Sequence, residues 1–203
     1  LSIFVSTVYM LKVKNVKRML AYSGIEHMGI VMLGVAAGGI GYYAAVLHII
    51  LHAFVKSSLF FQFNQLYRVF QDKSIYHIGN YFKYNATGAM VLLFGFISAT
   101  AMPPSGLFVS EFLIFKSIFD AGQIVLLIAV LLLLTLIIFA FGKNIFKILF
   151  IPAVGFDDSN VEKISPWESL SQFLFLAFAV YLGLNPPAIF VQLLKDSVSL
   201  LPM

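Results

Sequence analysis

The sequence contains no cysteine and very little charge. Without cysteine, disulfide frameworks, thiolate metal sites and cysteine nucleophiles are all excluded. Only 11% of the 203 residues are charged and 61% are apolar, whereas soluble domains carry about 25% charged and about 45–50% apolar residues. This composition excludes an ordinary soluble globule and low-complexity disorder, and indicates an integral membrane protein.

The chain opens at Leu1, inside an apolar run. A secretory signal peptide would show a charged start and a small-residue cleavage site, and neither is present. We therefore expect an N-terminally truncated sequence that begins within a helix.

Apolar runs of about 20 residues, long enough to cross a bilayer, divide the chain. We expect one all-α transmembrane bundle over 1–203, with the end of a helix at 1–11, spans at 19–37, 42–63, 86–119, 123–141 and 167–184, and cytoplasmic loops at 64–85 and 142–166. The run after residue 141 could continue as an amphipathic tail to Phe150. Gly38-Gly39-Ile40-Gly41 predicts a tight turn between two spans.

The run 86–119 is too long for one plain span, and Pro103, Pro104 and Gly106 interrupt it. Proline removes a backbone hydrogen bond inside a helix and clashes with the preceding turn. Freed backbone groups at membrane depth are tolerated only against protein or water. We therefore expect a broken helix at 102–106.

The positions of the basic residues indicate how the chain is oriented in the membrane. The formal net charge of +4, taken alone, could also suggest a nucleic-acid partner. Ten of the thirteen fall on one predicted side of the membrane: Lys12, Lys14, Lys17, Arg18, Arg68, Lys73, Lys83, Lys143, Lys147 and Lys163. Only Lys195 falls on the other side. The positive-inside rule makes the basic side cytoplasmic, in a bacterial or archaeal cytoplasmic membrane, and no nucleic-acid partner is needed.

Seven ionisable residues lie within the predicted spans: Glu26, His27, His48, His52, Lys56, Glu111 and Lys116. A charged side chain at the bilayer centre costs roughly 2.5–3.5 kcal/mol on insertion scales, so such groups usually face a bundle interior or a hydrated cavity. They are the candidate proton-pathway residues.

The first group is a row of two histidines and a lysine. His48, His52 and Lys56 stand at i, i+4 and i+8, which places them on one helix face rising about 12 Å. Imidazole and a desolvated lysine can both exchange protons near neutral pH. The alternative is structural, with histidines bonded to neighbouring helices and a lysine that reaches a head group.

The second group follows the helix break. Glu111 begins the second half of the broken helix, where a carboxylate can respond to hydration; alternatively it caps that helix and forms a static ion pair. Lys116 lies about 140° around the helix from Glu111, so the two should not pair directly. It is either a separate relay member or reaches the non-cytoplasmic surface.

Glu26 and His27 form the third group. Because they are adjacent, they should point to different faces, and at most one should line a pathway unless protein surrounds the helix. Glu26 could instead face the interface near the basic loop. No H-E-x-x-H spacing, phosphate loop or nucleophile elbow occurs, so we expect no catalytic, metal or cofactor site in this chain.

Three segments contain the helix break and six of the seven candidate pathway residues: KRMLAYSGIEHMG at 17–29, LHIILHAFVKS at 47–57 and MPPSGLFVSEF at 102–112. In this order and spacing they resemble the antiporter-like proton-pumping membrane subunits of respiratory complex I. The form around Glu26 is most similar to the hydrogenase-4 component F and formate hydrogenlyase type, followed by Mrp-type antiporter subunits.

The resemblance implies a fourteen-helix subunit built from two inverted five-helix repeats, of which this chain would hold most of the second repeat. It also implies a buried charged axis that includes His27, the His48–His52–Lys56 row and Glu111. Other membrane subunits would be its partners and protons, or Na⁺, its cargo. Iron–sulfur, nickel–iron or flavin centres would belong to partner subunits.

Three functions remain open from the sequence. The first is a proton-translocating subunit of a redox-driven complex of the membrane-bound hydrogenase or NADH-quinone oxidoreductase type. The second is a subunit of a multisubunit Mrp-type Na⁺/H⁺ antiporter. The third is a non-conducting membrane scaffold for a hydrogenase module.

Overall fold

The computed structural model describes residues 1–153, 155–156 and 161–199. These residues form a helical bundle without β-strands, in which one isolated antiparallel bridge joins Asn15 to Ser74. The helices are α1 (Ser2–Lys12), α2 (Val16–Ala37), α3 (Ile40–Phe70), α4 (Tyr81–Tyr84), α5 (Ala86–Ala99), α6 (Gly106–Asp120), α7 (Ile124–Phe150), α8 (Leu170–Leu184) and α9 (Ala188–Ser199), with a 3₁₀ turn η1 (Pro166–Ser169) before α8.

Four helical segments of the described chain are long and apolar enough to cross a membrane. They are Val16–Ala37, Ile40–Phe70, Ile124–Phe150 and Pro166–Leu184. The polytopic all-α membrane fold expected from the composition is therefore confirmed.

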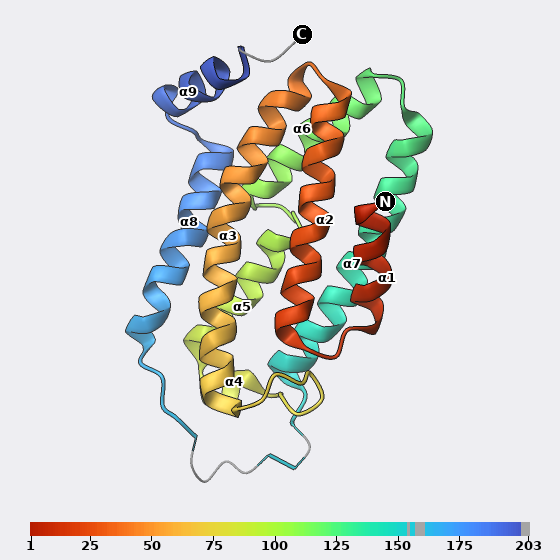
Figure 1. Cartoon of the computed structure of the whole chain (residues 1–203). Helices are drawn as coiled ribbons and strands as arrows, with labels where there is room; N and C mark the ends of the chain where they lie inside the picture. Colours follow the sequence, from red (N-terminus) through yellow and green to blue (C-terminus); the bar gives the residue numbers. More distant parts are fainter. Residues whose placement is uncertain (154, 157–160, 200–203) are drawn as a thin grey trace.

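The predicted break between two half-helices is also present. Helix α5 ends at Ala99 and α6 begins at Gly106, where the Ser105 hydroxyl accepts a hydrogen bond from the backbone N–H of Phe108 at 3.2 Å. Figure 1 shows the two halves stacked end to end within the bundle, joined by an irregular connection. Neither half is long enough to span a bilayer alone, so together they act as one discontinuous helix.

Helix α3 is the central element, because it packs against α2, α5, α6 and α8. The predicted tight turn joins it to α2, with positive φ angles of 73° at Gly38 and 54° at Gly39, a conformation that glycine adopts at little cost. Figure 1 places this turn and α9 at one end of the bundle, and α4 with the basic loops at the other.

Two helix boundaries differ from the sequence prediction. Helix α3 ends at Phe70 instead of residue 63, so 64–70 is not a loop; Leu66, Val69 and Phe70 are buried. Helix α7 continues to Phe150, as the possible amphipathic tail allowed, so its last nine residues do not belong to the loop expected at 142–166, and Ile145 and Leu149 are buried in the core. Polar residues on the exposed faces of these turns hid a continuous buried stripe on the opposite face.

Candidate functional site

Six of the seven predicted intramembrane residues gather where α2, α3 and α6 meet. Helix α2 contributes Glu26 and His27, α3 contributes the His48–His52–Lys56 row, and α6 contributes Glu111. Five of these side chains are buried, with exposed fractions of 7% or less, and His52 is half-buried. A polar cluster this well buried in a membrane bundle must satisfy its groups internally or with water.

His27 occupies the centre of this cluster. Its Nδ1 lies 3.1 Å from Nε2 of His48, and its Nε2 lies 2.9 Å from the carbonyl oxygen of Ala99 at the end of α5. The other ring nitrogen of His48, Nδ1, lies 2.9 Å from the Ser110 hydroxyl on α6. One hydrogen-bonded line therefore runs from α5 through α2 and α3 to α6 at the level of the helix break.

Two carboxylates flank His27. Glu111 Oε1 lies 3.5 Å from Nδ1 of His27, and Glu26 Oε2 lies 4.0 Å from Nε2. Both carboxylates line a cavity of about 20 Å³ beside Thr100 in the helix break and Ile137 of α7. That volume is sufficient for about one water molecule, which would be placed to hydrogen-bond with both carboxyl groups.

Lys56 lies about two turns along α3 from His48. Its ammonium donates hydrogen bonds to the Ser23 hydroxyl at 2.8 Å and to the carbonyl oxygen of Leu20 at 3.0 Å, both on α2. His52 lies one turn nearer the centre, and its ring centroid is 4.8 Å from that of His27. The Nε2 atom of His52 is buried without a hydrogen-bond partner among the described residues, so this ring is available to a water molecule or a mobile proton.

The same geometry brings potential metal ligands together. One ligand atom each from His27, His48 and Glu111 lies within 4.8 Å of the others. The spacing suits a small cation, but the 3.1 Å separation of the two imidazole nitrogens is that of a direct hydrogen bond. The two rings therefore contact each other directly.

The family to which the chain belongs follows from comparison with known proteins. The model of the family described as "NADH:quinone oxidoreductase/Mrp antiporter, TM" matches residues 1–137. The chain belongs to this antiporter-like family.

Curated relatives carry names of three kinds of complex. The chain is 31% identical over 119 residues to a hydrogenase-4 component F homolog of Methylacidiphilum infernorum, a match that covers 58% of this chain and 25% of the relative. It is 34% identical over 126 residues to NADH-quinone oxidoreductase subunit N of Ruthia magnifica, covering 61% and 26%. It is 27% identical over 132 residues to formate hydrogenlyase subunit 3 of Escherichia coli, covering 59% and 22%. These matches span about a quarter of each relative.

Solved structures share the fold over almost the whole chain. A chain of the Mrp complex from Dietzia superposes with a TM-score of 0.85 at 15% identity, over 98% of this chain and 45% of that one. A chain of respiratory complex I from Thermus thermophilus with bound NADH gives 0.80 at 22% identity, over 100% and 43%. The antiporter-like fold expected from the three motifs is therefore confirmed.

One predicted pathway residue of this antiporter-like chain lies apart from the cluster. Lys116 is exposed and pairs with Asp120 one turn further along α6, so it does not contact Glu111. Glu26 and His27 meet the condition under which both could face one pathway, because protein surrounds their helix. Because α1, α3 and α6 all pack against α2, both neighbouring side chains are buried and lie beside the cluster.

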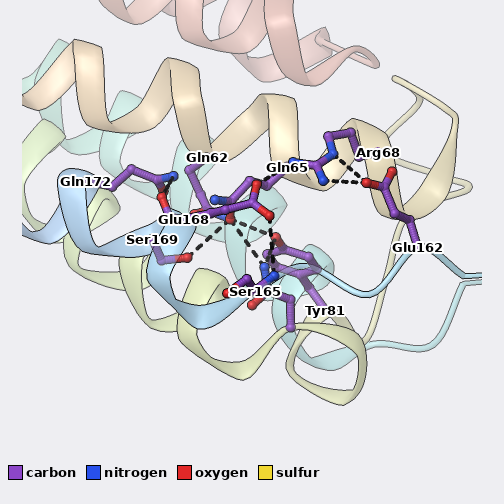
Figure 2. Close-up of polar contacts among 10 residues, drawn as sticks. Gln62, Gln65, Arg68, Tyr81, Glu162, Ser165, Glu168, Ser169 and Gln172 are labelled. Carbon is purple, nitrogen blue, oxygen red and sulfur yellow. Dashed lines mark hydrogen bonds and ion pairs between the residues drawn. The ribbon is translucent and has the colours of Figure 1, made fainter.

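A second buried polar group was not anticipated. It is shown in Figure 2, lies towards the basic end of the bundle, and we call it the glutamine cluster: Gln62, Gln65, Tyr81, Asn85, Ser169 and Gln172. The Tyr81 hydroxyl accepts hydrogen bonds from Gln62 at 2.7 Å and Asn85 at 3.0 Å, and Ser169 donates to Gln65 at 3.3 Å. The Oε1 atoms of Gln62 and Gln172 are buried without a hydrogen-bond partner among the residues that the structure describes.

An ion-paired arginine closes the outer side of the glutamine cluster. Arg68, six residues after Gln62 on α3, pairs with Glu162 and with Glu168 of η1. These contacts tie the segment before α8 to the end of α3. The glutamine cluster has no sequence signal, because its members come from helices far apart in the chain, and the contact between Ser110 and His48 likewise joins residues 62 positions apart.

Proposed function

We propose that this chain forms the proton-conducting part of a membrane subunit in a redox-driven complex. Protons would move along the buried line formed by Lys56, His52, His48, His27, Glu26 and Glu111. The matched relatives are named as subunits of NADH-quinone oxidoreductase, hydrogenase-4 and formate hydrogenlyase, and redox centres would reside in partner subunits. The basic loops would face the cytoplasm of a bacterium or archaeon.

The central position of His27 carries this proposal. One imidazole contacts or nearly contacts four other ionisable side chains at membrane depth. A static structural role would need only the bonds to Ala99 and His48, because a buried polar group is satisfied once each of its atoms is paired. Imidazole can both accept and release a proton, so additional acidic and basic neighbours provide donors and acceptors on either side.

The test replaces charged members of the line in the full-length subunit within its native complex. Glu111→Gln and Lys56→Met remove the charge but retain much of the side-chain volume, and Lys116→Gln is the matched control, because Lys116 is exposed on the same helix as Glu111. In reconstituted vesicles we expect the first two variants to lose proton translocation while electron transfer and assembly persist. Wild-type pumping in both would refute the proposal.

The two alternatives give different results in the same experiment. A non-conducting scaffold predicts that Glu111→Gln and Lys56→Met impair assembly, with transport normal in whatever assembles. An Mrp-type antiporter, favoured by the fold match to the Dietzia Mrp complex, predicts proton movement driven by a Na⁺ gradient without electron transfer. An imposed Na⁺ gradient in vesicles without electron donor separates this function from a redox pump.

A further inference from the structure

A groove of about 420 Å³ lies at the basic end of the bundle, away from the polar cluster around His27. The end of α1, the segment after α3 and the last part of α7 form its walls. The groove is partly basic and partly apolar, because three lysines line it together with exposed apolar side chains. Such a basic pocket between transmembrane helices, on the cytoplasmic side, is suited to an anionic lipid head group.

The three lysines are Lys12, Lys143 and Lys147. Within the described parts of the chain, none of them forms an ion pair with a carboxylate. Lys147 donates a hydrogen bond to the carbonyl oxygen of Ile75 at 2.8 Å and lies 4.6 Å from the ring centroid of Tyr76. Lys12 and Lys143 are exposed, so their ammonium groups are available to an anion.

The apolar part of the groove continues from the lysines towards the membrane. Phe139, Lys143 and Lys147 stand at i, i+4 and i+8 on α7, so one helix face changes from aromatic to cationic over about 12 Å. Phe139 is 64% exposed, and Leu11 on α1 is 49% exposed. A phospholipid has the same polarity along its length, with a charged head group above apolar chains.

We propose that this groove binds an anionic phospholipid, with the phosphate beside Lys12 and Lys143 and an acyl chain along Phe139 and Leu11. A soluble anion would use the lysines but leave the apolar wall exposed to water. A zwitterionic lipid would gain little from unpaired ammonium groups. The combination therefore selects a lipid with net negative charge.

Native mass spectrometry of the full-length complex tests this proposal. The complex is taken from nanodiscs of phosphatidylcholine with or without phosphatidylglycerol, and bound lipids are counted. Two removed lysines should weaken binding about thirtyfold, at roughly 1 kcal/mol per basic residue, so K12Q/K143Q should lose one phosphatidylglycerol per chain. K14Q/K163Q is the matched control, because both residues are exposed basic-side lysines outside the groove.

Each other outcome overturns the proposal. Equal retention of phosphatidylglycerol in both double variants would show that the groove is not the binding site. Displacement of the lipid by millimolar inorganic phosphate would identify a site for a soluble anion. Equal retention of phosphatidylcholine would show that the lysines do not select the head group.

A different observation, at Ser110, deepens the proposed proton-conducting function and rests on it. The Ala99 carbonyl can only accept, so Nε2 of His27 carries hydrogen and Nδ1 of the neutral ring accepts from His48. Nδ1 of His48 then has no hydrogen and must accept from Ser110. Yet Ser110 also lies 3.0 Å from the carbonyl oxygen of Leu107, which can only accept as well.

The single hydroxyl proton of Ser110 cannot satisfy both acceptors. While His48 is neutral, Ser110 donates to His48; when His48 carries a second proton, both of its ring nitrogens donate, and Ser110 accepts from His48 while donating to Leu107. We propose that Ser110 is a positioning residue whose hydroxyl turns between these two acceptors as a proton enters and leaves His48.

An isosteric pair of variants isolates the hydroxyl. Ser110→Thr retains the hydroxyl, and Ser110→Val lacks it at nearly equal volume. Ser117→Thr and Ser117→Val are the controls, because the buried Ser117 hydroxyl donates to the backbone carbonyl of Ile114 on its own helix. A hydrogen bond to a charged group contributes enough for about a tenfold change in rate. We expect S110V to pump about tenfold more slowly than S110T, with equal assembly, and the Ser117 pair to be alike.

The outcomes distinguish this proposal from the proposed function. Equal pumping by S110T and S110V, with pumping abolished by Glu111→Gln, would overturn the role of Ser110 alone. If Glu111→Gln and Lys56→Met also pump normally, the proton pathway itself is wrong. Slower pumping in both Val variants would indicate a packing effect and would likewise overturn the proposal.

Discussion

Gly106 and Gly183 meet backbone to backbone where the second half of the broken helix crosses α8. A Cβ atom on Gly183 would lie 2.2 Å from the Cα atom of Gly106, and one on Gly106 would lie 2.1 Å from the carbonyl oxygen of Ala179. Real Cβ contacts are never this short. The start of α6 is therefore fixed against α8 by the absence of two side chains, which places Ser110 and Glu111 one turn further along.

Alanine at either glycine should separate these helices. We expect Gly106→Ala and Gly183→Ala each to destabilise the subunit by about 1–3 kcal/mol, the usual cost of overpacking. Gly24→Ala is the control, because a Cβ there meets nothing within 4 Å and alanine favours the helix. Thermal unfolding of the purified complex, followed by size-exclusion chromatography, measures the difference; an equally stable Gly106→Ala variant would contradict this packing.

Ser23 should matter because it is one of two acceptors for the Lys56 ammonium. Ser23→Ala leaves the Leu20 carbonyl as the one acceptor among the described residues, and a hydrogen bond to a charged group contributes about 1.5–3 kcal/mol. We expect proton translocation to fall about tenfold or more with assembly intact. Ser58→Ala is the comparison, since Ser58 lies on the same helix as Lys56 but bonds the backbone of Gln172; equal transport in both variants would contradict a special role for Ser23.

The sequence anticipated those features that depend on local patterns. The Pro103-Pro104 break, the turn at Gly38 and the common face of His48 and His52 all follow from residue spacing, and the structure contains each of them. The histidine pair across two helices did not follow. His27 and His48 are 21 residues apart, and His27 meets Ala99 across 72 residues, so only the packing of α2 between α3 and the break brings them together.

The glutamine cluster also depends on contacts between residues far apart in the sequence, which spacing alone could not predict. Gln65 and Ser169 are 104 residues apart in the sequence and hydrogen-bond in the structure. Read singly, each is an ordinary polar residue near a membrane boundary. Their burial arises because α3 extends past residue 63 and α8 packs along it, and the amphipathic pattern in that region was too weak to predict the extension.

The loop after α3 should respond to acid. The backbone N–H of Ser74 and the His77 side chain donate to Asp72 and hold the pKa of its carboxyl group below the ordinary value of 3.8. Since the folded-state pKa is lower than the unfolded one, this stabilisation is present above pH 3.8 and is lost as the pH falls through the folded value. The effect should be small, because the Asp72 side chain is 39% exposed and solvent screens its charge.

Limited proteolysis of the loop from pH 5 to pH 3 measures that response. We expect wild-type protein to become more susceptible near Asp72 only at the acid end. Asp72→Asn should be susceptible throughout this range, because it lacks the charge at every pH. A pH-independent wild-type loop would show that the contacts of Asp72 do not stabilise it.

Water should reach the glutamine cluster from the basic side of the membrane. Buried oxygens in proteins are almost always hydrogen-bonded to protein or water, and Oε1 of Gln62 and of Gln172 have no protein partner in the described chain. One turn towards the membrane centre from Gln62, Leu59 is fully buried in the apolar core. Hydration should therefore extend to the glutamines and stop at Leu59.

The sequence has no natural cysteine, so single introduced cysteines can show how far water penetrates. Thiols react as thiolates, which need water to form, so labelling reports hydration. In vesicles with the basic face outward, we expect N-ethylmaleimide to modify Gln172→Cys and to leave Leu59→Cys unmodified, with peptide mass spectrometry as the readout. Adding Arg68→Ala should speed labelling at residue 172, because Arg68 ties the segment before α8 to α3. Equal labelling at residues 59 and 172 would contradict a barrier at Leu59, and no labelling at residue 172 would show a dry cluster.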